Sequence, residues 1–321
     1  MLRLRLLRVW LTHRQPLLLF VRFGGIGDIL CSLPAYAALC RAHPNAHGVF
    51  ITLAEFQCLP QLAQAPGTLC ASRVHCSIPN FPRSLVAQIF QPQYTDEIGR
   101  QNSTAHLVDE FYHACGLQPA GDSPRFKINS AQRDALGKLF QLPSASGAKI
   151  VVIHPGPSWK VREWPVAHWQ ALVDGLHAAG SVRILQIGAH RHVTLGATEA
   201  ATLHGVESLV GKLSLTEMAA LLTLTDLFIG IDSGMIHMAG AAGTPCVGIF
   251  GPTNPAYRIF PSPHAVGLFH TLPCSFCHHR QPRLHWQSGC PNDIACMKQL
   301  APATVLAESL RQLNLAGATT R

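Results

Sequence analysis

Hydrophobic and polar positions alternate along the first half of this chain in a way that predicts strands and helices in turn. Residues 17–23 form an apolar run broken only by Arg22, and a glycine-rich turn separates this run from a helical pattern at 29–41. The alternation continues with a strand at 49–53 and helical patterns ending at 65 and covering 84–90 and 104–115. Such alternation favours a parallel sheet covered by helices on both faces.

The same pattern begins again after a stretch of small and polar residues at 142–149. Four strands are expected there, at 150–154, 182–188, 227–232 and 245–250. Between them, two apolar stripes at helical spacing predict core-facing helices: Trp169, Leu172, Val173 and Leu176, then Leu215, Met218, Ala219 and Leu222. We therefore expect two doubly wound α/β domains, one over residues 1–146 and one over 147–321, facing each other across a cleft.

Size and charge narrow the class of protein. A chain of 321 residues with 48% hydrophobic residues fills two cores. Uncharged apolar runs stay below the ~18 residues that span a bilayer, so no transmembrane helix is expected. Arginines interrupt the apolar start of the chain and no small-residue cleavage site follows, which argues against a signal peptide and for a cytoplasmic protein.

The net charge of +8 suits an anionic partner. Charged residues make up only 13% and the basic ones are scattered without a nucleic-acid-binding motif, so a nucleic acid is not expected. A phosphorylated metabolite and a membrane surface remain as candidate anionic partners. The arginines near the N-terminus either contact anionic lipid or form a solvated basic tail.

The richest motif lies at 229–237, where Asp232, Ser233, Gly234 and His237 pass from a strand end onto the first turn of a helix. Free backbone N–H groups and the helix dipole stabilise an anion at such a turn. The next strand ends near Thr253, so two strand ends can converge on one ligand. The alternative is an ordinary helix cap by Ser233.

A glycine-rich turn with Gly24, Gly25 and Gly27 leads to Asp28. Its spacing departs from the dinucleotide fingerprint and no ribose-binding acid follows, which argues against a dehydrogenase. At a helix start the charged form of Asp28 is stabilised, so we expect it to face the cleft ionised. The alternative is a first-turn acid with no catalytic role.

Two cations, Lys160 and Arg162, stand in the loop before a helix that begins at Pro165. They could neutralise charge on a leaving phosphate. The alternative is a surface loop in which Glu163 pairs with its neighbours.

Four of the 11 cysteines cluster near the C-terminus, within an insert at about 273–297: Cys274, Cys277, Cys290 and Cys296. Their spacing can close a tetrahedral thiolate site for zinc or iron, with a structural role because no coordination position stays open. Nearby His278, His279 and His285 could replace a ligand, but we expect them to face solvent. The other cysteines are dispersed and read as buried thiols.

Taken together, these motifs resemble glycosyltransferase family nine, the ADP-heptose:lipopolysaccharide heptosyltransferases. The resemblance rests on residues 22–28 with Leu33 and Pro34, on 162–165, on 232–237 and on 250–255, in the family's order. It implies a GT-B fold with an acceptor-binding N-terminal half and a nucleotide-sugar-binding C-terminal half.

The resemblance also implies roles for single residues. Asp28 matches the catalytic base, and Arg162 stands where the family usually has a lysine that contacts the donor diphosphate. Asp232, Ser233, Gly234 and His237 match the donor loop. The implied reaction is transfer of heptose from ADP-heptose to a hydroxyl of the lipopolysaccharide inner core, inverting and without a catalytic metal. Some members that glycosylate proteins carry cysteine-bound iron in a comparable insert.

One departure from the family leaves the donor open. Where an acid often contacts the ribose, residues 188–192 read Gly-Ala-His-Arg-His, so another nucleotide sugar, or a ribose held by His192 or by backbone, is an alternative. Arg73, Arg83 and Arg100 are candidate contacts to an anionic glycolipid acceptor. Rival functions are a transferase with a protein acceptor, a non-catalytic sugar-nucleotide-binding protein and a sugar-nucleotide epimerase.

Overall fold

A computed structural model describes residues 2–72, 82–92, 105–142, 147–192, 198–280 and 289–314, which form two compact units. The first takes in the described residues up to Lys127 and the second those from Ile128 on. The division expected at 146/147 lies later than this boundary, because α5 (Ser130–Leu139) packs on α7 (Leu215–Thr223) of the second unit. The polar stretch at 142–149 thus belongs to that unit; its residues 143–146 lie outside the described structure.

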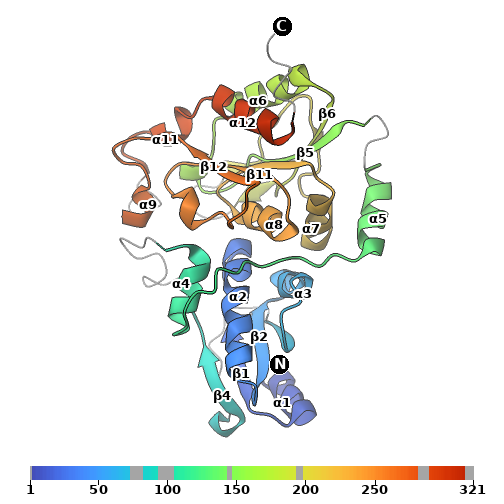
Figure 1. Cartoon of the computed structure of the whole chain (residues 1–321), viewed down its shortest axis with the longest axis vertical. Coiled ribbons are helices and arrows are strands. Elements are labelled where there is room, and N and C mark those ends of the chain that lie inside the picture. Colours follow the sequence, from blue (N-terminus) through green and yellow to red (C-terminus); the bar gives the residue numbers. More distant parts are fainter. Residues whose placement is uncertain are drawn as a thin grey trace. The chain divides into compact units, whose positions relative to one another are not determined.

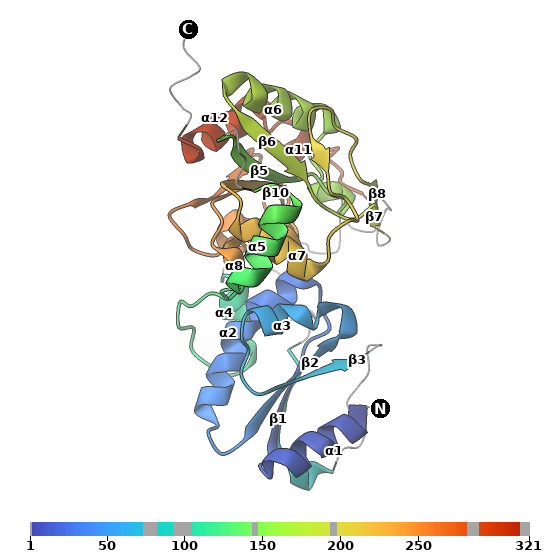
Figure 2. The same cartoon turned by 90° about the vertical axis from the view of Figure 1, so that its right-hand side faces the viewer.

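The described part of the first unit contains a parallel sheet with the strand order β3-β2-β1-β4. Helix α1 (Leu2–His13) packs on one face of this sheet, where fully buried Leu6 meets Leu19 and Ile51. The long helix α2 (Ile26–Ala42) lies along the sheet on its other side (Figures 1 and 2). The other elements are β1 (Leu17–Val21), β2 (His47–Leu53), α3 (Cys58–Leu62), β3 (Thr68–Ser72), β4 (Val86–Phe90) and α4 (Leu107–Ala114).

The helix expected at 84–90 is wrong. A short 3-10 turn at Arg83–Leu85 is followed by the edge strand β4, which pairs with β1 through contacts such as Leu19 with Ile89. Val86, Ile89 and Phe90 fit helical spacing by chance, whereas β-branched and aromatic residues are enriched in strands. The basic N-terminal stretch, for which a solvated tail was one alternative, is helix α1.

The second unit is built on a larger parallel sheet, whose order in the described residues is β12-β11-β10-β5-β6-β9. Helices α6 and α12 cover one face, and α7 and α8 lie on the other (Figures 1 and 2). The bounds of its main elements are β5 (Lys149–His154), α6 (Val166–Ala179), β6 (Val182–Gln186), β9 (Glu207–Ser208), β10 (Leu227–Ile231), α8 (Gly234–Ala242), β11 (Cys246–Phe250), β12 (Ala265–Phe269), α9 (Cys277–Arg280), α11 (Ala295–Lys298) and α12 (Pro302–Gln312). A two-stranded antiparallel ribbon joins β7 (Arg191–His192) to β8 (Thr198–Glu199).

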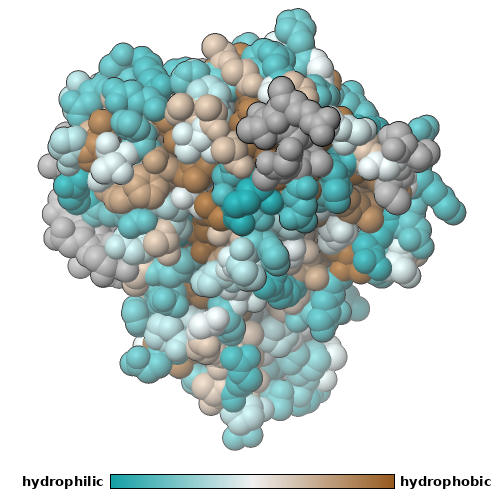
Figure 3. All heavy atoms as spheres, turned by 45° about the horizontal axis from the view of Figure 1, so that its top comes forward, coloured by the Kyte–Doolittle hydropathy of each residue, from teal (hydrophilic) through white to brown (hydrophobic). Residues whose placement is uncertain are grey.

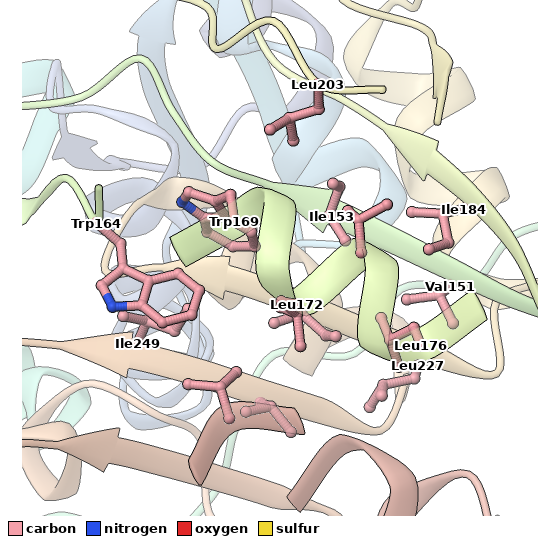
Figure 4. Packing of buried hydrophobic residues seen from close by; sticks show 14 of the residues in the cluster. Val151, Ile153, Trp164, Trp169, Leu172, Leu176, Ile184, Leu203, Leu227 and Ile249 are labelled. Carbon is pink, nitrogen blue, oxygen red and sulfur yellow. The ribbon is translucent and has the colours of Figure 1, made fainter. Parts of the chain in front are cut away.

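The core of the second unit confirms the first predicted helical stripe. Trp169, Leu172, Val173 and Leu176 are fully buried and pack from α6 against Ile153 and its neighbours in the sheet (Figure 4). Trp164, just before α6, meets Trp169 edge-on at 5.3 Å between ring centroids. This packing fixes the sheet whose strand ends carry the polar motifs.

On the face of the molecule drawn in Figure 3, hydrophilic residues predominate and hydrophobic ones show in small groups. None of the described helices combines the length and the apolarity needed to cross a bilayer.

Candidate functional site

The sheet of the second unit reverses its strand order between β5 and β10. From β5 the chain crosses to β6 on one side, whereas β10 leads to β11 on the other. At such a switch point the loops after the two strands diverge and leave room for a ligand beyond the carboxyl ends. His154 ends β5, Asp232 and Ser233 follow β10, and Thr253 follows β11. The sequence motifs therefore meet at one sheet edge, as predicted.

Asp232 is the centre of a buried ionic group. It is 3% exposed, its Oδ2 lies 3.4 Å from Nε of Arg162, and it accepts a 2.5 Å hydrogen bond from Oγ1 of Thr253. Nη1 of Arg162 also donates to the backbone carbonyl of Asp232. Burial alone would raise the pKa of Asp232, but Arg162, Arg258 and Thr253 outweigh it and hold the pKa at about 2. The carboxylate is therefore ionised at neutral pH.

Arg162 is held by stacking as well as by charge. Its guanidinium carbon lies 4.1 Å from the centroid of the Trp159 ring, a cation–π contact. Lys160, one turn of 3-10 helix away, has a side chain 69% exposed and pairs with Glu163 at 3.6 Å. The two cations predicted together are thus separated: Arg162 joins the buried group, and Lys160 forms the surface pair that was the alternative.

Ser233 caps α8, which was the alternative for this motif, and it also contacts the end of β5. Its Oγ accepts from the backbone N–H of Met235 at 3.3 Å and lies 3.2 Å from Nδ1 of His154. Burial lowers the pKa of His154 to about 4, so this imidazole is neutral at neutral pH. Gly234 is the first residue of α8, and the helix points its N-terminal N–H groups toward the region after β10.

His237 lies inside α8 and is 5% exposed. Its ring is 5.4 Å from that of Phe260, and its electrostatic interaction with Asp232 is the smallest of the causes that lower the pKa of that carboxyl. His237 is therefore a buried residue of α8 that interacts with Asp232.

Two histidines assigned to solvent are buried, so that expectation is wrong. His278 is 2% and His279 is 7% exposed. Nε2 of His279 accepts a 2.9 Å hydrogen bond from the backbone N–H of Asn254, and the N–H of His278 donates to the carbonyl of Pro252. Burial is the largest cause that lowers their pKa values, to about 2 and about 4, with Arg162 and Arg258 adding to it. The two histidines that follow Cys277 thus pack against the loop after β11.

The four clustered cysteines line one cavity of about 20 Å³, together with Gly251 and residues of the neighbouring loops. All four are free thiols. This volume is that of about one water-sized sphere. In the described residues, no three His, Cys, Asp or Glu side chains stand in an arrangement that would hold a metal ion. The four cysteines thus lie around one cavity, but their side chains are not arranged as a metal coordination sphere, and the metal site stays a prediction.

In the first unit, Asp28 lies in the first turn of α2 with its side chain 26% exposed. Oδ2 accepts from the backbone N–H of Gly25 at 3.2 Å and pairs with Nη2 of Arg22 at 3.2 Å. Arg22 is 2% exposed and also donates to the carbonyl of Pro92 at 3.0 Å. One backbone donor and one guanidinium, the latter through an ion pair, therefore converge on the same carboxylate oxygen.

Gly24 makes this approach possible. A Cβ at Gly24 would lie 2.6 Å from Nη2 of Arg22 and 2.7 Å from Oδ2 of Asp28. At Gly25 the nearest atom would be Oδ2 of Asp28, at 4.0 Å. Position 24 therefore needs glycine for two reasons: the tight turn, and the space that Arg22 and Asp28 need in order to pair. No separate role is visible for Gly27.

Some candidate residues fall outside the described structure. These are Arg73, Arg100, Cys76, His285 and the side chain of His192. Arg83 is described, in the 3-10 turn before β4. No role was predicted from the sequence for Arg22 or Arg258, and the burial of His279 was not expected. For Arg22, the available signal was a charge inside an otherwise apolar strand.

Comparisons with known proteins point to one family. The family model for glycosyltransferase family 9 (heptosyltransferase) matches residues 84–286, more than half of the chain. Lipopolysaccharide heptosyltransferase 1 of Pseudomonas aeruginosa is 31% identical over 134 residues, 41% of this chain and 37% of that protein. Lipopolysaccharide heptosyltransferase 3 of Escherichia coli is 34% identical over 111 residues, 34% of this chain and 33% of that protein. The chain thus spans about a third of the length of the curated relatives it matches.

Solved structures extend the likeness to the fold of nearly the whole chain. The iron-containing dodecameric glycosyltransferase TibC of enterotoxigenic Escherichia coli has a TM-score of 0.72 at 18% identity, over 94% of this chain and 76% of that one. The ADP-heptose lipopolysaccharide heptosyltransferase II of Escherichia coli has a TM-score of 0.68 at 15% identity, over 94% and 100%. Together with the two parallel sheets, these similarities confirm the α/β, GT-B fold class, whereas the cleft between the domains stays a prediction. By its family match, the chain belongs to glycosyltransferase family 9, the heptosyltransferase family.

Proposed function

We propose that this protein transfers heptose from ADP-heptose to a hydroxyl of the lipopolysaccharide inner core, with inversion and without a catalytic metal. The observation that carries the proposal is the buried Asp232–Arg162 pair beside the capped start of α8, at the switch point of the second sheet. Family membership and the likeness to lipopolysaccharide heptosyltransferases support the donor and the acceptor class. We also propose that the reaction takes place in the cytoplasm.

The second unit supplies what a leaving diphosphate needs. Arg162 and the first N–H groups of α8 stabilise negative charge on the phosphates. Ser233 and neutral His154 add hydrogen-bonding groups without adding charge. Lys160, exposed and on a flexible stem, could reach a bound donor from the rim. Asp232 and Thr253 act on the donor indirectly, by fixing Arg162 and the loop ends.

The first unit supplies the base. As the acceptor oxygen attacks the anomeric carbon, its proton passes to the carboxylate of Asp28, and the carbon–oxygen bond to the diphosphate breaks with its electron pair leaving on ADP. One displacement with one base inverts the anomeric carbon. Arg22 and the N–H of Gly25 orient Asp28 through Oδ2.

The decisive experiment incubates the full chain with ADP-heptose and a truncated core acceptor and follows the acceptor by mass spectrometry. We expect one added heptose with the wild type. Asp28→Asn should lower the rate about 10²- to 10⁴-fold, the usual contribution of a general base, while ADP binding is retained. Asp134→Asn, which changes an exposed carboxylate on α5, is the matched control and should not lower it.

Other outcomes would favour the rivals. Donor binding without transfer to any acceptor indicates a non-catalytic sugar-nucleotide-binding protein. A sugar nucleotide that changes without an acceptor indicates an epimerase. Full activity of Asp28→Asn contradicts the assigned base.

A protein acceptor is the second candidate function. The observation in its favour is the cavity lined by four cysteines, because the sequence resembles members that glycosylate proteins and carry cysteine-bound iron, and the fold is similar to an iron-containing glycosyltransferase. Offering the truncated core and an unfolded polypeptide acceptor in competition separates the two: labelled heptose ends either on the glycolipid or on the polypeptide.

The same four cysteines carry a second part of the proposal, a structural zinc or iron ion. Four thiol donors around a cavity of about 20 Å³ fit the chemistry and the size of one such ion. When bound, the metal would crosslink the loops that hold His278 and His279 against the strand ends. Four protein ligands leave no position for substrate, so the ion has no step in the reaction.

Metal analysis of the purified protein tests this part. We expect about one zinc or iron per chain, and a loss of it in Cys277→Ser and Cys290→Ser but not in Cys58→Ser, which lies outside the cluster. A correctly folded sample without either metal would contradict the assignment.

A further inference from the structure

Helix α1 exposes a stripe of large hydrophobic side chains. Leu4, Leu7 and Leu11 are 72%, 38% and 46% exposed, and their spacing places them on one face of the helix. Large exposed hydrophobic residues elsewhere in the described structure stand singly on different elements: Ile89, Leu139, Val166 and Phe269. A row of three on twelve residues is therefore a local feature of α1 and is not the ordinary scatter of a protein surface.

The opposite stripe of the same helix is anchored in the first unit. Leu6 is fully buried, and Leu2, Val9 and Trp10 pack against the core under the sheet. Nη1 of Arg5 also donates to the carbonyl of Ala71 in β3, at 3.2 Å. Because these contacts fix the rotation of the helix about its axis, the leucine stripe is held on the outside of the folded unit.

Charge on α1 is of one sign. Residues 2–14 contain arginines at 3, 5, 8 and 14 and no acidic residue. At about 100° per residue, Arg3 falls beside the leucine stripe on one side and Arg8 on the other, and Arg14 follows the end of the helix. Arg14 lies over the ring of Trp10, with 5.3 Å between its guanidinium carbon and the ring centroid. An apolar stripe flanked by arginines and an aromatic ring is the pattern of helices that lie in a membrane interface.

We propose that α1 docks the protein on an anionic phospholipid bilayer, lying flat with Leu4, Leu7 and Leu11 among the upper acyl segments and the flanking arginines among the headgroups. Twelve residues extend about 18 Å, whereas the hydrocarbon core is about 30 Å thick, so the helix lies on the bilayer and does not cross it. Anionic headgroups match the unmixed positive charge.

A second copy of the chain fits this surface less well. Two-fold pairing through α1 would set the same arginines against each other, and three leucines offer little area compared with a stable dimer interface. The inference does not depend on the proposed transfer reaction, because α1 contributes no residue to the donor site or to the Asp28 turn.

Vesicle co-sedimentation of the full chain tests the proposal. We expect binding to vesicles that contain phosphatidylglycerol, little binding to pure phosphatidylcholine, and weakening as salt is raised. The triple variant Leu4→Gln, Leu7→Gln and Leu11→Gln should lower the partition coefficient at least about tenfold, because it removes the inserted apolar area. Leu139→Gln, an equally exposed leucine on α5, should leave it unchanged.

The changed side chains point outward, so folding is expected to survive; circular dichroism and the thermal transition check it. A folded triple variant that binds as tightly as the wild type would overturn the proposal, and so would a wild type that ignores anionic vesicles. A wild type that is dimeric in solution and becomes monomeric in the triple variant, without vesicle binding, would assign the stripe to contact between copies.

Discussion

Gly24 sets how closely Arg22 and Asp28 approach each other. Alanine at 24 would place its Cβ 2.6 Å from Nη2 of Arg22 and 2.7 Å from Cβ of Asp28, and Arg22 is too buried to move aside. We expect Gly24→Ala to separate the pair and to lower the rate of heptose transfer at least tenfold, with ADP affinity unchanged because the donor site lies in the second unit. Steady-state kinetics and ADP titration measure both.

Gly25→Ala is the matched control for that change. Its new Cβ would meet only Oδ2 of Asp28, at 4.0 Å, and the backbone φ of −70° suits alanine. The N–H that donates to Asp28 is retained. Equal losses in the two variants would mean that the turn, and not the Arg22–Asp28 pair, needs the glycines.

His154 links the stability of the second unit to pH. Burial lowers its pKa from 6.5 to about 4, so as the pH falls the unfolded chain takes up this proton before the native state does. The stabilisation is complete above pH 6.5 and is lost between pH 6.5 and 4, by an amount on the order of 3 kcal/mol.

We therefore expect His154→Asn, which keeps a polar group near Ser233, to flatten the pH dependence of the unfolding free energy in that window. Denaturant unfolding of both proteins at pH 7 and pH 5 measures the difference. Parallel curves would show that protonation of His154 does not oppose folding.

The residues of the proposed donor site were predictable to the extent that they follow strand ends. Asp232, Ser233 and Thr253 could be placed together because neighbouring parallel strands end at one edge. The burial of His278 and His279 could not be predicted. It depends on their contact with the loop after β11, and their segment has no hydrophobic periodicity that would indicate this contact. Local spacing alone did not distinguish Lys160 from Arg162, since the ion pair with Asp232 and the packing on Trp159 depend on the tertiary fold.

Among the elements, the connection between β2 and β3 shows how backbone packing restricts a single position. Gly67 has a φ of +74°, and a Cβ there would lie within 3 Å of the carbonyl carbon of Gly48 in β2. Gly116, at the end of α4, has a similar φ of +70° but open space around it. The two glycines therefore share a conformational requirement and differ in the room available.

We expect Gly116→Ala to cost about 1–2 kcal/mol of unfolding free energy, the strain of a left-handed residue. Gly67→Ala should cost clearly more, because the clash is with backbone, which cannot rotate away. Equilibrium unfolding of the two variants gives the comparison. Similar losses would mean that the β2–β3 connection yields to the added methyl group.

Element prediction succeeded where periodicity and packing agree, as in α6 and the strands of the second sheet. It failed at 84–90, where the apolar residues fit a helix and only pairing with β1 makes the segment a strand. The unit boundary was misplaced for a related reason: α5 belongs to the second unit through its contact with α7, which no local composition reveals.

At the scale of the whole molecule, each unit has its own hydrophobic core. We expect two calorimetric transitions, of which ADP raises only that of the second unit. At a hundred times its Kd, a ligand bound to the native state adds about 2.7 kcal/mol to the unfolding free energy. Arg162→Met should reduce the shift, because it removes the cation proposed to bind the diphosphate. A single transition that ADP raises as a whole would show that the units unfold as one.

The pairing of Asp232 with Arg162 bears on how the product escapes. Arg162 pairs with Asp232 within the protein, so in the proposed reaction the guanidinium would keep an anionic partner when ADP leaves. The pair would thus lower the electrostatic cost of releasing the nucleotide. Because product release limits the turnover rate of many enzymes, Asp232 would influence that rate without contacting the sugar.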